Sequence, residues 1–198
     1  MIKLLMAGIF AYLLGSMSFG IIIPRLLGTS RDIRQEGSGN AGATNVLRTQ
    51  GKLQGALVLL TDLLKGALAA WIGLSLAGVA GGGVAGIFAM LGHCFPVFFG
   101  FKGGKGVATG AGVVLVLLPK ALLIMIAAFI LAILITRMVS LGSIAGAVTL
   151  LVCMLFFQPP VPIILFGVCA VALVLWKHES NIKRILAGTE NKLGKKNK

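Results

Sequence analysis

Long apolar segments separated by short polar ones run through almost the entire chain. Seven such segments can be delimited, at residues 4–27, 53–76, 79–99, 107–118, 121–136, 141–157 and 161–176. A helix that crosses a bilayer needs about 20 predominantly apolar residues, with a lower limit near ~17. By this measure the fourth segment is too short and the fifth is marginal. Pro119 and Lys120 between them therefore mark either a turn between two helices or a kink in one long helix.

The distribution of basic residues decides between these topologies. If the chain crosses seven times from an external N-terminus, fifteen of its 18 lysines and arginines fall on one side. Two, Lys3 and Lys120, fall on the other, and Lys65 lies inside the membrane. If the chain crosses six times, the split becomes seven against nine. Because cytoplasmic loops carry an excess of Lys and Arg, we predict an all-α integral membrane protein with seven transmembrane helices, the N-terminus outside and the C-terminus cytoplasmic. The short fourth helix then requires Lys105 to snorkel to the interface or the bilayer to thin locally.

Composition agrees with a membrane protein. Of the 198 residues, 58% are hydrophobic and only 12% are charged, whereas a soluble domain carries about 25% charged residues. The formal net charge of +13 raises the question of nucleic acid. Nucleic-acid binding requires a basic face with stacking aromatics or a known module, and the few aromatics here lie in apolar segments. We therefore expect no nucleic acid partner, and attribute the charge to sidedness and to attraction by anionic lipid headgroups.

Other features predict one compact bundle over residues 1–198. The three cysteines have no metal-ligand spacing and are expected to be small hydrophobic residues: Cys94, Cys153 and Cys169. The first apolar segment is too long for a signal-peptide core and lacks a small-residue cleavage site, so we expect it to remain as a helix. Small residues recur four positions apart, as at Gly82 and Gly86, a spacing that lets helices approach closely in lipid.

The polar segment 36–48 combines glycines, neutral hydrogen-bonding side chains and an arginine. Three glycines allow positive φ and exposed backbone N–H groups: Gly37, Gly39 and Gly42. Four neutral side chains can bind a ligand: Ser38, Asn40, Thr44 and Asn45. A helix starting near Thr44 would place Asn45 and Arg48 on one face, where the Arg48 fork suits phosphate and the helix N-terminus adds positive potential. The alternative is a surface loop in which Ser38 or Thr44 caps a helix.

The segment 92–110 carries a second glycine-rich stretch. Its sequence Lys-Gly-Gly-Lys-Gly at 102–106 opens the fourth span, which puts glycines and lysines at a helix N-terminus, a geometry that suits an anion. It is not a Walker A loop, because the first glycine, the spacing and a preceding strand are absent. The alternative is that Lys102 and Lys105 only mark the membrane boundary. His93 is either a structural hydrogen-bonding residue at the end of the third span or a catalytic group.

Ionisable residues also occur within a predicted span. Asp62 and Lys65 lie three apart on one face of the second span. Such residues are costly in a bilayer and are usually paired or face a cavity. Either they pair with each other, or Asp62 holds a cation from the cytoplasmic side.

The remaining candidates flank the last two spans. Ser140 is an N-cap candidate for the sixth span, and Ser143 either caps weakly or points its hydroxyl toward the cytoplasmic site. After the last span, His178 and Asn181 share a helical face. A basic juxtamembrane helix is typically a headgroup anchor, but these two side chains suggest that it also braces or lines the site. The tail 192–198 is expected to be a solvated basic end.

Taken together, these stretches resemble the PlsY family of bacterial acyl-phosphate:glycerol-3-phosphate acyltransferases. The resemblance rests on GSMSFG at 15–20, GSGNAGATNVLR at 37–48, GHCFP at 92–96, FKGGKGVAT at 101–109, VSLGS at 139–143 and HESN at 178–181. These follow the order of the family and cover nearly the whole chain. The resemblance implies a seven-helix fold with an external N-terminus, as one polytopic acyltransferase domain over 1–198.

The implied activity is transfer of a fatty acyl group from acyl phosphate to the 1-hydroxyl of sn-glycerol 3-phosphate. The products are lysophosphatidic acid and phosphate, in the first acylation step of phospholipid biosynthesis. The implied location is the bacterial inner membrane, with the site on its cytoplasmic face. The partners are the two substrates, the lipid bilayer and an upstream enzyme that forms acyl phosphate; no cofactor and no metal are expected.

The resemblance also implies roles for residues. Those expected to act in catalysis are Ser38, Arg48, Lys105, Ser143, His178 and Asn181. Those expected to bind substrate are Gly37, Gly39, Asn40, Gly42, Thr44, Asn45, Lys102, Gly103, Gly104 and Gly106.

For the mechanism, an acyl phosphate is already activated and needs no enzyme nucleophile. Arg48 and Lys105 would neutralise phosphate and stabilise the leaving group. No carboxylate is plainly placed as a base among Asp32, Glu36, Asp62, Glu179 and Glu190. The hydroxyl proton therefore goes either to His178 or, as we favour, to the substrate's own phosphate.

Three other classes are weighed against this one. Acyltransferases that use acyl-CoA or acyl-carrier protein carry His-x4-Asp, but Phe98 follows His93 at that spacing and Lys183 follows His178. A transporter would show internal symmetry and a polar path at the membrane midplane. Here only Asp62 and Lys65 indicate polar residues at the midplane. A non-catalytic lipid-binding protein would not need so many phosphate-type loops.

Overall fold

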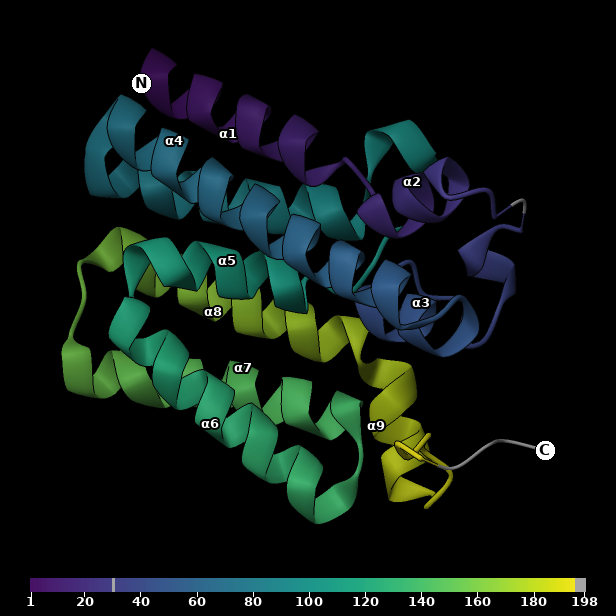
Figure 1. The fold of residues 1–198 in the computed structure, drawn as a ribbon. Coiled ribbons are helices and arrows are strands. Elements are labelled where there is room, and N and C mark those ends of the chain that lie inside the picture. The colour runs from purple at the N-terminus through teal and green to yellow at the C-terminus, as the bar shows by residue number, and fades with distance from the viewer. Residues whose placement is uncertain (30, 195–198) are drawn as a thin grey trace.

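The computed structural model describes residues 1–29 and 31–194, and within them the regular structure is helical. The lysines at 195, 196 and 198 of the predicted basic tail lie outside the described residues. The elements in chain order are α1 Ile2–Gly15, α2 Phe19–Leu26, η1 Ile33–Gln35, α3 Ala43–Thr49, α4 Lys52–Cys94, η2 Val97–Phe99, α5 Val107–Leu117, α6 Pro119–Thr136, α7 Val139–Phe157, α8 Val161–Lys177 and α9 Glu179–Leu186. The long helices lie side by side as a bundle (Figure 1).

Helix α4 consists of two helices that fold back on each other. Its backbone leaves the helical conformation at Ala77 and at Gly78, which has φ +60°. Beyond this point the chain returns so closely that a Cβ on Gly73 would lie 2.4 Å from the carbonyl oxygen of Gly81. The predicted division of this stretch into segments 53–76 and 79–99 is therefore confirmed.

The first apolar segment is a broken helix. Helices α1 and α2 meet at 42° around residues 16–18, where the Met17 carbonyl accepts from the N–H of Phe19 at 3.1 Å and lies outside the regular helical pattern. Lys65 Nζ donates a hydrogen bond to this carbonyl at 2.8 Å. Helix α1 then packs on the second half of α4, and a Cβ on Gly15 would lie 2.2 Å from the Ala89 carbonyl oxygen. Two glycine-lined helices thus meet at backbone contact, as the small-residue spacing predicts.

Helices α5 and α6 are separate elements. Leu118 between them has φ −147° and ψ +62°, and Pro119 starts α6 at its first turn, where its missing N–H costs no hydrogen bond. By length and composition three of the described helices can cross a membrane, or five if each bent pair counts as one span. The eleven residues of α5 form a shorter apolar helix.

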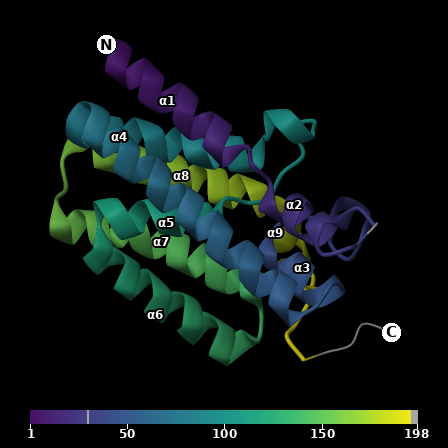
Figure 2. The ribbon, with the colours of Figure 1, turned by 45° about the horizontal axis from the view of Figure 1, so that its top comes forward.

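The short helices and the polar loops gather at one end of the bundle, which we call the polar end. Helices α2, α3 and α9 lie together at the end opposite the N-terminus, as Figures 1 and 2 both show. The largest apolar core lies between α4, α5, α7 and α8 and includes Met90, Val113, Leu150 and Phe166. Every loop that the sequence singles out as a candidate for phosphate binding therefore meets the others at the same end.

Candidate functional site

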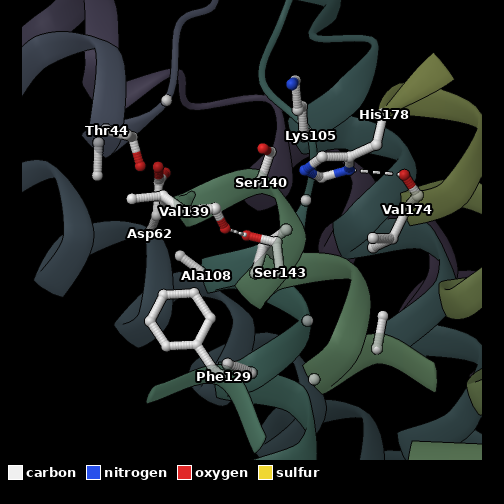
Figure 3. A pocket seen from close by; sticks show the side chains of 18 of the residues that line it. Thr44, Asp62, Lys105, Ala108, Phe129, Val139, Ser140, Ser143, Val174 and His178 are labelled. Carbon is white, nitrogen blue, oxygen red and sulfur yellow. Dashed lines mark hydrogen bonds between the residues drawn. The ribbon is translucent and has the colours of Figure 1, made fainter. Parts of the chain in front are cut away.

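A cavity of about 350 Å³ opens at the polar end and reaches down into the bundle. This volume lies within the ~300–1,000 Å³ that small-molecule sites occupy. We call its polar entrance the rim; it comprises Ser38, Asn40, Arg48, Lys105, His178, Asn181, Arg184 and Glu190. We call its apolar interior the shaft; it comprises Val114, Leu122, Ala147, Leu150, Phe166 and Ala170. Figure 3 shows Lys105 and His178 together at one end of the view, with Phe129 at the other.

Asn45 organises the loop that precedes α3. Its Nδ2 donates to the carbonyl oxygens of Ile33 and Glu36, at 3.2 and 2.9 Å. Its Oδ1 accepts from the backbone N–H of Ser38 at 2.9 Å. Gly37 has φ +57°, and a Cβ there would lie 2.3 Å from Asn45 Oδ1. The glycine therefore lets the loop close onto α3, which brings Ser38 to the rim.

Arg34 ties this first loop to the second. Its guanidinium forms an ion pair with Asp32 at 2.7 Å and donates to the Phe99 carbonyl at 2.8 Å. Hydrogen bonds from Arg34 lower the pKa of Asp32 to about 2, against a smaller opposing effect of burial. The two loops are thus held together by the Arg34 guanidinium, which an ionised Asp32 carboxylate holds in place.

The glycines of the second loop pack against the end of α4. The N–H groups of Gly103 and Gly104 donate to the carbonyls of Cys94 and His93, at 3.3 and 3.1 Å. A Cβ on Gly104 would lie 2.1 Å from His93 Nε2, so only glycine allows this approach. Gly106, with φ +81°, then turns the chain into α5. The effect of the packing is to aim Lys105 into the cavity.

The predicted site residues fall into two groups. Those that line the cavity are Ser38, Asn40, Gly42, Thr44, Asn45, Arg48, Lys105, Gly106, Ser143, His178 and Asn181. Those that lie outside the lining are Gly37, Gly39, Lys102, Gly103 and Gly104. The four glycines lie in the two loops on the side away from the cavity and determine the backbone conformation there. Lys102 is exposed.

Glu190 is the centre of a hydrogen-bonded cluster at the rim. Its Oε1 accepts from Asn181 Nδ2 at 2.7 Å and from Ser140 Oγ at 2.9 Å. Its Oε2 accepts from Arg184 Nε at 2.8 Å. Lys105 Nζ in turn donates to Asn181 Oδ1. A chain of contacts therefore runs from the carboxylate through the amide to the lysine.

Two conclusions about single residues follow from this cluster. The predicted N-cap role of Ser140 is wrong: Met138 is the N-cap residue of α7, and the Ser140 hydroxyl is bound to Glu190 instead. No role for Glu190 was predicted from the sequence, although a single carboxylate in a basic tail, two residues after a glycine, is a usable signal. In the structure that glycine, Gly188, has φ +70°. The tail is held further by Leu193, whose N–H donates to the Arg137 carbonyl at 2.8 Å.

Charge in the rim is set by burial and by these contacts. Burial lowers the pKa of the Lys105 ammonium to about 8, while the Glu190 carboxylate opposes this shift. Burial alone would raise the pKa of Glu190, but hydrogen bonds from Asn181, Arg184 and Ser140 bring it below its ordinary value. At neutral pH the rim therefore contains a carboxylate and a largely protonated lysine.

His178 is held as a neutral ring. Its Nδ1 lies 2.8 Å from the Val174 carbonyl oxygen, which can only accept, so the proton sits on Nδ1 and Nε2 is left as an acceptor. Burial, and next the charge of Lys105, lower the pKa of His178 to about 4. One turn into α7, the Ser143 hydroxyl donates to the Val139 carbonyl at 3.0 Å, and Figure 3 shows both of these bonds.

A buried ionic group forms part of the cavity wall. Lys65 Nζ lies 2.7 Å from Asp62 Oδ1, and His93 Nδ1 lies 3.5 Å from the same oxygen. All three side chains are buried, and Asp62 and His93 line the cavity. Asp62 thus pairs with Lys65, one of the two alternatives left open by the sequence, and His93 joins them because α4 folds back. Among the described residues no three metal-ligating side chains of the His, Cys, Asp or Glu types cluster.

Comparisons with known proteins agree with this picture. A protein-family model described as glycerol-3-phosphate acyltransferase matches residues 5–188. The glycerol-3-phosphate acyltransferase of Thermoanaerobacter pseudethanolicus is 45% identical over 191 residues, which is 96% of each chain. That of Shouchella clausii is 45% identical over 202 residues, or 98% of each.

Two solved structures of a glycerol 3-phosphate acyltransferase have the same fold as this chain. The crystal structure of PlsY (YgiH), an integral membrane glycerol 3-phosphate acyltransferase, in its glycerol 3-phosphate form is 41% identical. It superposes with a TM-score of 0.92 over 96% of each chain. The lysophosphatidic acid form of that protein is 40% identical, with a TM-score of 0.90 over 96% of this chain and 95% of that one.

Proposed function

The chain belongs to the glycerol-3-phosphate acyltransferase family, and from this premise we propose that its acyl donor is acyl phosphate. The acyl group would pass to the 1-hydroxyl of sn-glycerol 3-phosphate, giving lysophosphatidic acid and inorganic phosphate. One observation carries the proposal: a single cavity joins a cationic rim to an apolar shaft. Two phosphorylated substrates, one with a fatty chain, need both parts at once.

The choice of donor follows from the chemistry available at the rim. An acyl phosphate is a mixed anhydride, so the attacking alcohol can displace phosphate directly without a covalent enzyme intermediate. Arg48 and Lys105 supply two cations for the phosphates, and preorganised positive charge stabilises a leaving group whose negative charge grows in the transition state. In this step the hydroxyl oxygen bonds to the acyl carbon, the carbon–oxygen bond to phosphate breaks, and its electron pair leaves with the phosphate.

The hydroxyl proton goes to a phosphate of the substrates. His178 offers Nε2 as an acceptor, but with a pKa of about 4 it is a poor base. The second pKa of a phosphate monoester is about 6, which makes the phosphate dianion the better acceptor. His178 then has the role of orienting the hydroxyl through a hydrogen bond.

Of the other predicted residues, some would contact the substrates and some would support the loops that form the site. Ser38, Asn40, Thr44 and Ser143 would contact the substrates from the cavity wall, and Asn181 would hold the Lys105 ammonium in place. Gly42 and Gly106 let the backbone come close to a phosphate. Outside the cavity, Gly37, Gly39, Gly103 and Gly104 would support the loops, and Lys102 would meet lipid headgroups at the membrane surface.

The membrane arrangement is part of the same proposal. With the two halves of α4 counted separately and α5 as a short span, the chain forms one domain of seven transmembrane helices. The N-terminus is outside the bacterial inner membrane, and the site faces the cytoplasm. The gathering of α2, α3 and α9 at one end supports this, together with the basic residues of their loops. An enzyme that makes acyl phosphate would supply the donor from the same side.

The test is a phosphate-release assay on the purified protein in lipid nanodiscs. With palmitoyl phosphate and glycerol 3-phosphate we expect stoichiometric phosphate and lysophosphatidic acid. With palmitoyl-CoA as the donor we expect no product. Phosphate release that is independent of glycerol 3-phosphate, or transfer from the thioester alone, would overturn the assignment of the donor.

A further inference from the structure

The shaft ends at a closed floor inside the bundle. Its deepest lining residues are Val114 of α5, Leu150 of α7 and Phe166 of α8, which are 1%, 2% and 0% exposed. One turn further down, Met154 and Ile163 belong to the packed core and do not line the cavity. A molecule that enters from the rim therefore meets a solid layer at Phe166.

Close helix contacts hold this floor in place. A Cβ on Gly86 of α4 would lie 2.8 Å from the ring of Phe166, so the ring rests on backbone that bears no side chain. Just below, a Cβ on Gly167 would lie 1.8 Å from the terminal methyl of Met154. The Phe166 ring is thus packed against α4, while the next residue, Gly167, is packed against α7, and α8 is held between the two.

The depth of the shaft matches one leaflet of a bilayer. Along α7, Leu150 lies ten residues below Ser140, and along α8, Phe166 lies twelve residues below His178. At a rise of about 1.5 Å per residue, these distances are about 15 and about 18 Å. Half of a hydrocarbon core of about 30 Å is about 15 Å. A fatty chain bound from the rim would span this depth and then stop.

Small side chains keep the shaft open above the floor. Ala147 lies one turn above Leu150 on α7, and Ala170 lies one turn above Phe166 on α8. Both are buried and both line the cavity. Gly146 also lines the cavity and lets α7 approach α6 closely, because a Cβ there would lie 3.3 Å from the Met125 carbonyl oxygen. A larger side chain at either alanine would close the shaft about two-thirds of the way down, at roughly 10–12 Å.

We propose that Phe166 is the residue that limits the length of the acyl chain, with Ala147 and Ala170 keeping open the path that leads to it. This inference rests on the proposed transfer of a fatty acyl group. It assigns the chain to the shaft rather than to the lipid-facing side of the cavity, where Leu59 of α4 and Ile126 of α6 are 52% and 44% exposed. If the acyl chain left the cavity sideways past those residues, the protein would set no limit on its length.

The experiment compares kcat/KM for lauroyl, palmitoyl and arachidoyl phosphate in matched variants. Phe166→Ala lowers the floor, and its control is Leu165→Ala, the neighbouring residue that faces outward and is 57% exposed. Ala170→Leu fills the shaft, and its control is Ala172→Leu at an exposed position of the same helix. All variants are measured with glycerol 3-phosphate as the acceptor, in the same nanodiscs.

Opposite shifts are expected from the two variants. Each CH₂ newly accommodated below the floor is worth about fourfold in kcat/KM, so Phe166→Ala should raise arachidoyl relative to palmitoyl transfer by about tenfold or more. Ala170→Leu should lower palmitoyl transfer by a similar factor and leave lauroyl transfer near that of the wild type. Both controls should keep the wild-type profile.

Two results would overturn the inference, and they differ in meaning. If the wild type transfers palmitoyl groups but all variants keep its chain-length profile, Phe166 is not the limit and the chain leaves sideways. If the wild type transfers no acyl group from any of the three donors, the proposed function itself fails. Because a buried ring is costly to remove, Phe166→Leu replaces Phe166→Ala if the latter does not fold, and Ala170→Leu tests separately whether the chain occupies the shaft.

Discussion

The rim and the shaft of the cavity are built in opposite ways. The rim brings together residues from Ser38 to Glu190, mostly from loops and the tail, and side-chain hydrogen bonds hold them. The shaft is built from regular helices that touch through glycine and alanine. Even the glycines differ: Gly37 in the rim loop has positive φ, whereas Gly86 beside the shaft is helical and gives close approach.

This difference predicts how substitutions in the two regions will affect the protein. A hydrogen-bonded assembly depends on each donor and acceptor, because a buried polar group left unpaired is costly. A helix-packed cavity depends on volume instead and tolerates changes that keep its shape. We therefore expect rim substitutions to reduce turnover steeply and shaft substitutions to alter selectivity.

The largest expected effect lies at Asp62, where a charged group is buried among the helices. Asp62→Asn leaves the Lys65 ammonium without its ion-pair partner in the bundle. Breaking a buried pair on one side costs about 3–5 kcal/mol, measurable by thermal unfolding in detergent. The double variant Asp62→Leu with Lys65→Met removes both charges and should regain most of this stability. A double variant as unstable as the single one would show that Asp62 acts through something other than the pair.

The next effect concerns the cation aimed into the rim. Lys105→Met removes one preorganised positive charge and should lower kcat/KM by about 10²–10³. Lys102→Met, three residues away and exposed, serves as the matched control and should retain activity within about twofold. Equal losses in the two variants would mean that both lysines act only through the membrane surface.

A smaller effect is expected from the carboxylate behind that cation. Glu190→Gln keeps the shape but removes the charge that binds Arg184 and Asn181. Hydrogen bonds to charged groups are worth about 1.5–3 kcal/mol, so we expect a loss of activity of about tenfold to a hundredfold. Glu179→Gln alters an exposed pair with Lys183 and should leave activity unchanged. A rim organised mainly by backbone would show no difference between the two variants.

The smallest effect is a dependence on pH. The protonated Lys105 is the active form, and its lowered pKa of about 8 means that the charge is present below that pH and is lost above it. Activity should therefore fall by about tenfold between pH 7 and pH 9. In Lys105→Arg the guanidinium stays charged, so any residual activity should lack this decline. A decline at the same pH in the arginine variant would assign it to another group.

The sequence predicted helix positions well because lipid imposes a strong pattern. The turn within α4 was placed correctly between residues 76 and 79, where Gly78 takes positive φ. The break around Met17 was not foreseen, because apolar residues flank it on both sides and only the tertiary contact with Lys65 reveals it.

The same contrast applies to the site. Arg48, Lys105 and His178 were predicted as one group and do line one cavity, because short motifs of polar residues beside apolar helices are conspicuous. Glu190 was left unplaced and Ser140 was misassigned as a cap, because each is defined by the other across fifty residues of chain. Local patterns can single out either residue, but they do not show that the two side chains are bonded to each other.

The bond from Lys65 to the Met17 carbonyl has a consequence for how the protein is made. The segment 52–76 carries two charges in its interior, Asp62 and Lys65, each of which opposes insertion into a bilayer by about 2.5–3.5 kcal/mol at a helix centre. The break after the preceding helix offers the Met17 carbonyl, which lies outside the regular helical hydrogen-bond pattern and can accept a second hydrogen bond, so the two segments should leave the translocation channel as a pair rather than one at a time. A glycosylation-mapping experiment can check this: segment 52–76 should insert poorly alone and efficiently behind residues 2–26, and equal insertion in both contexts would contradict it.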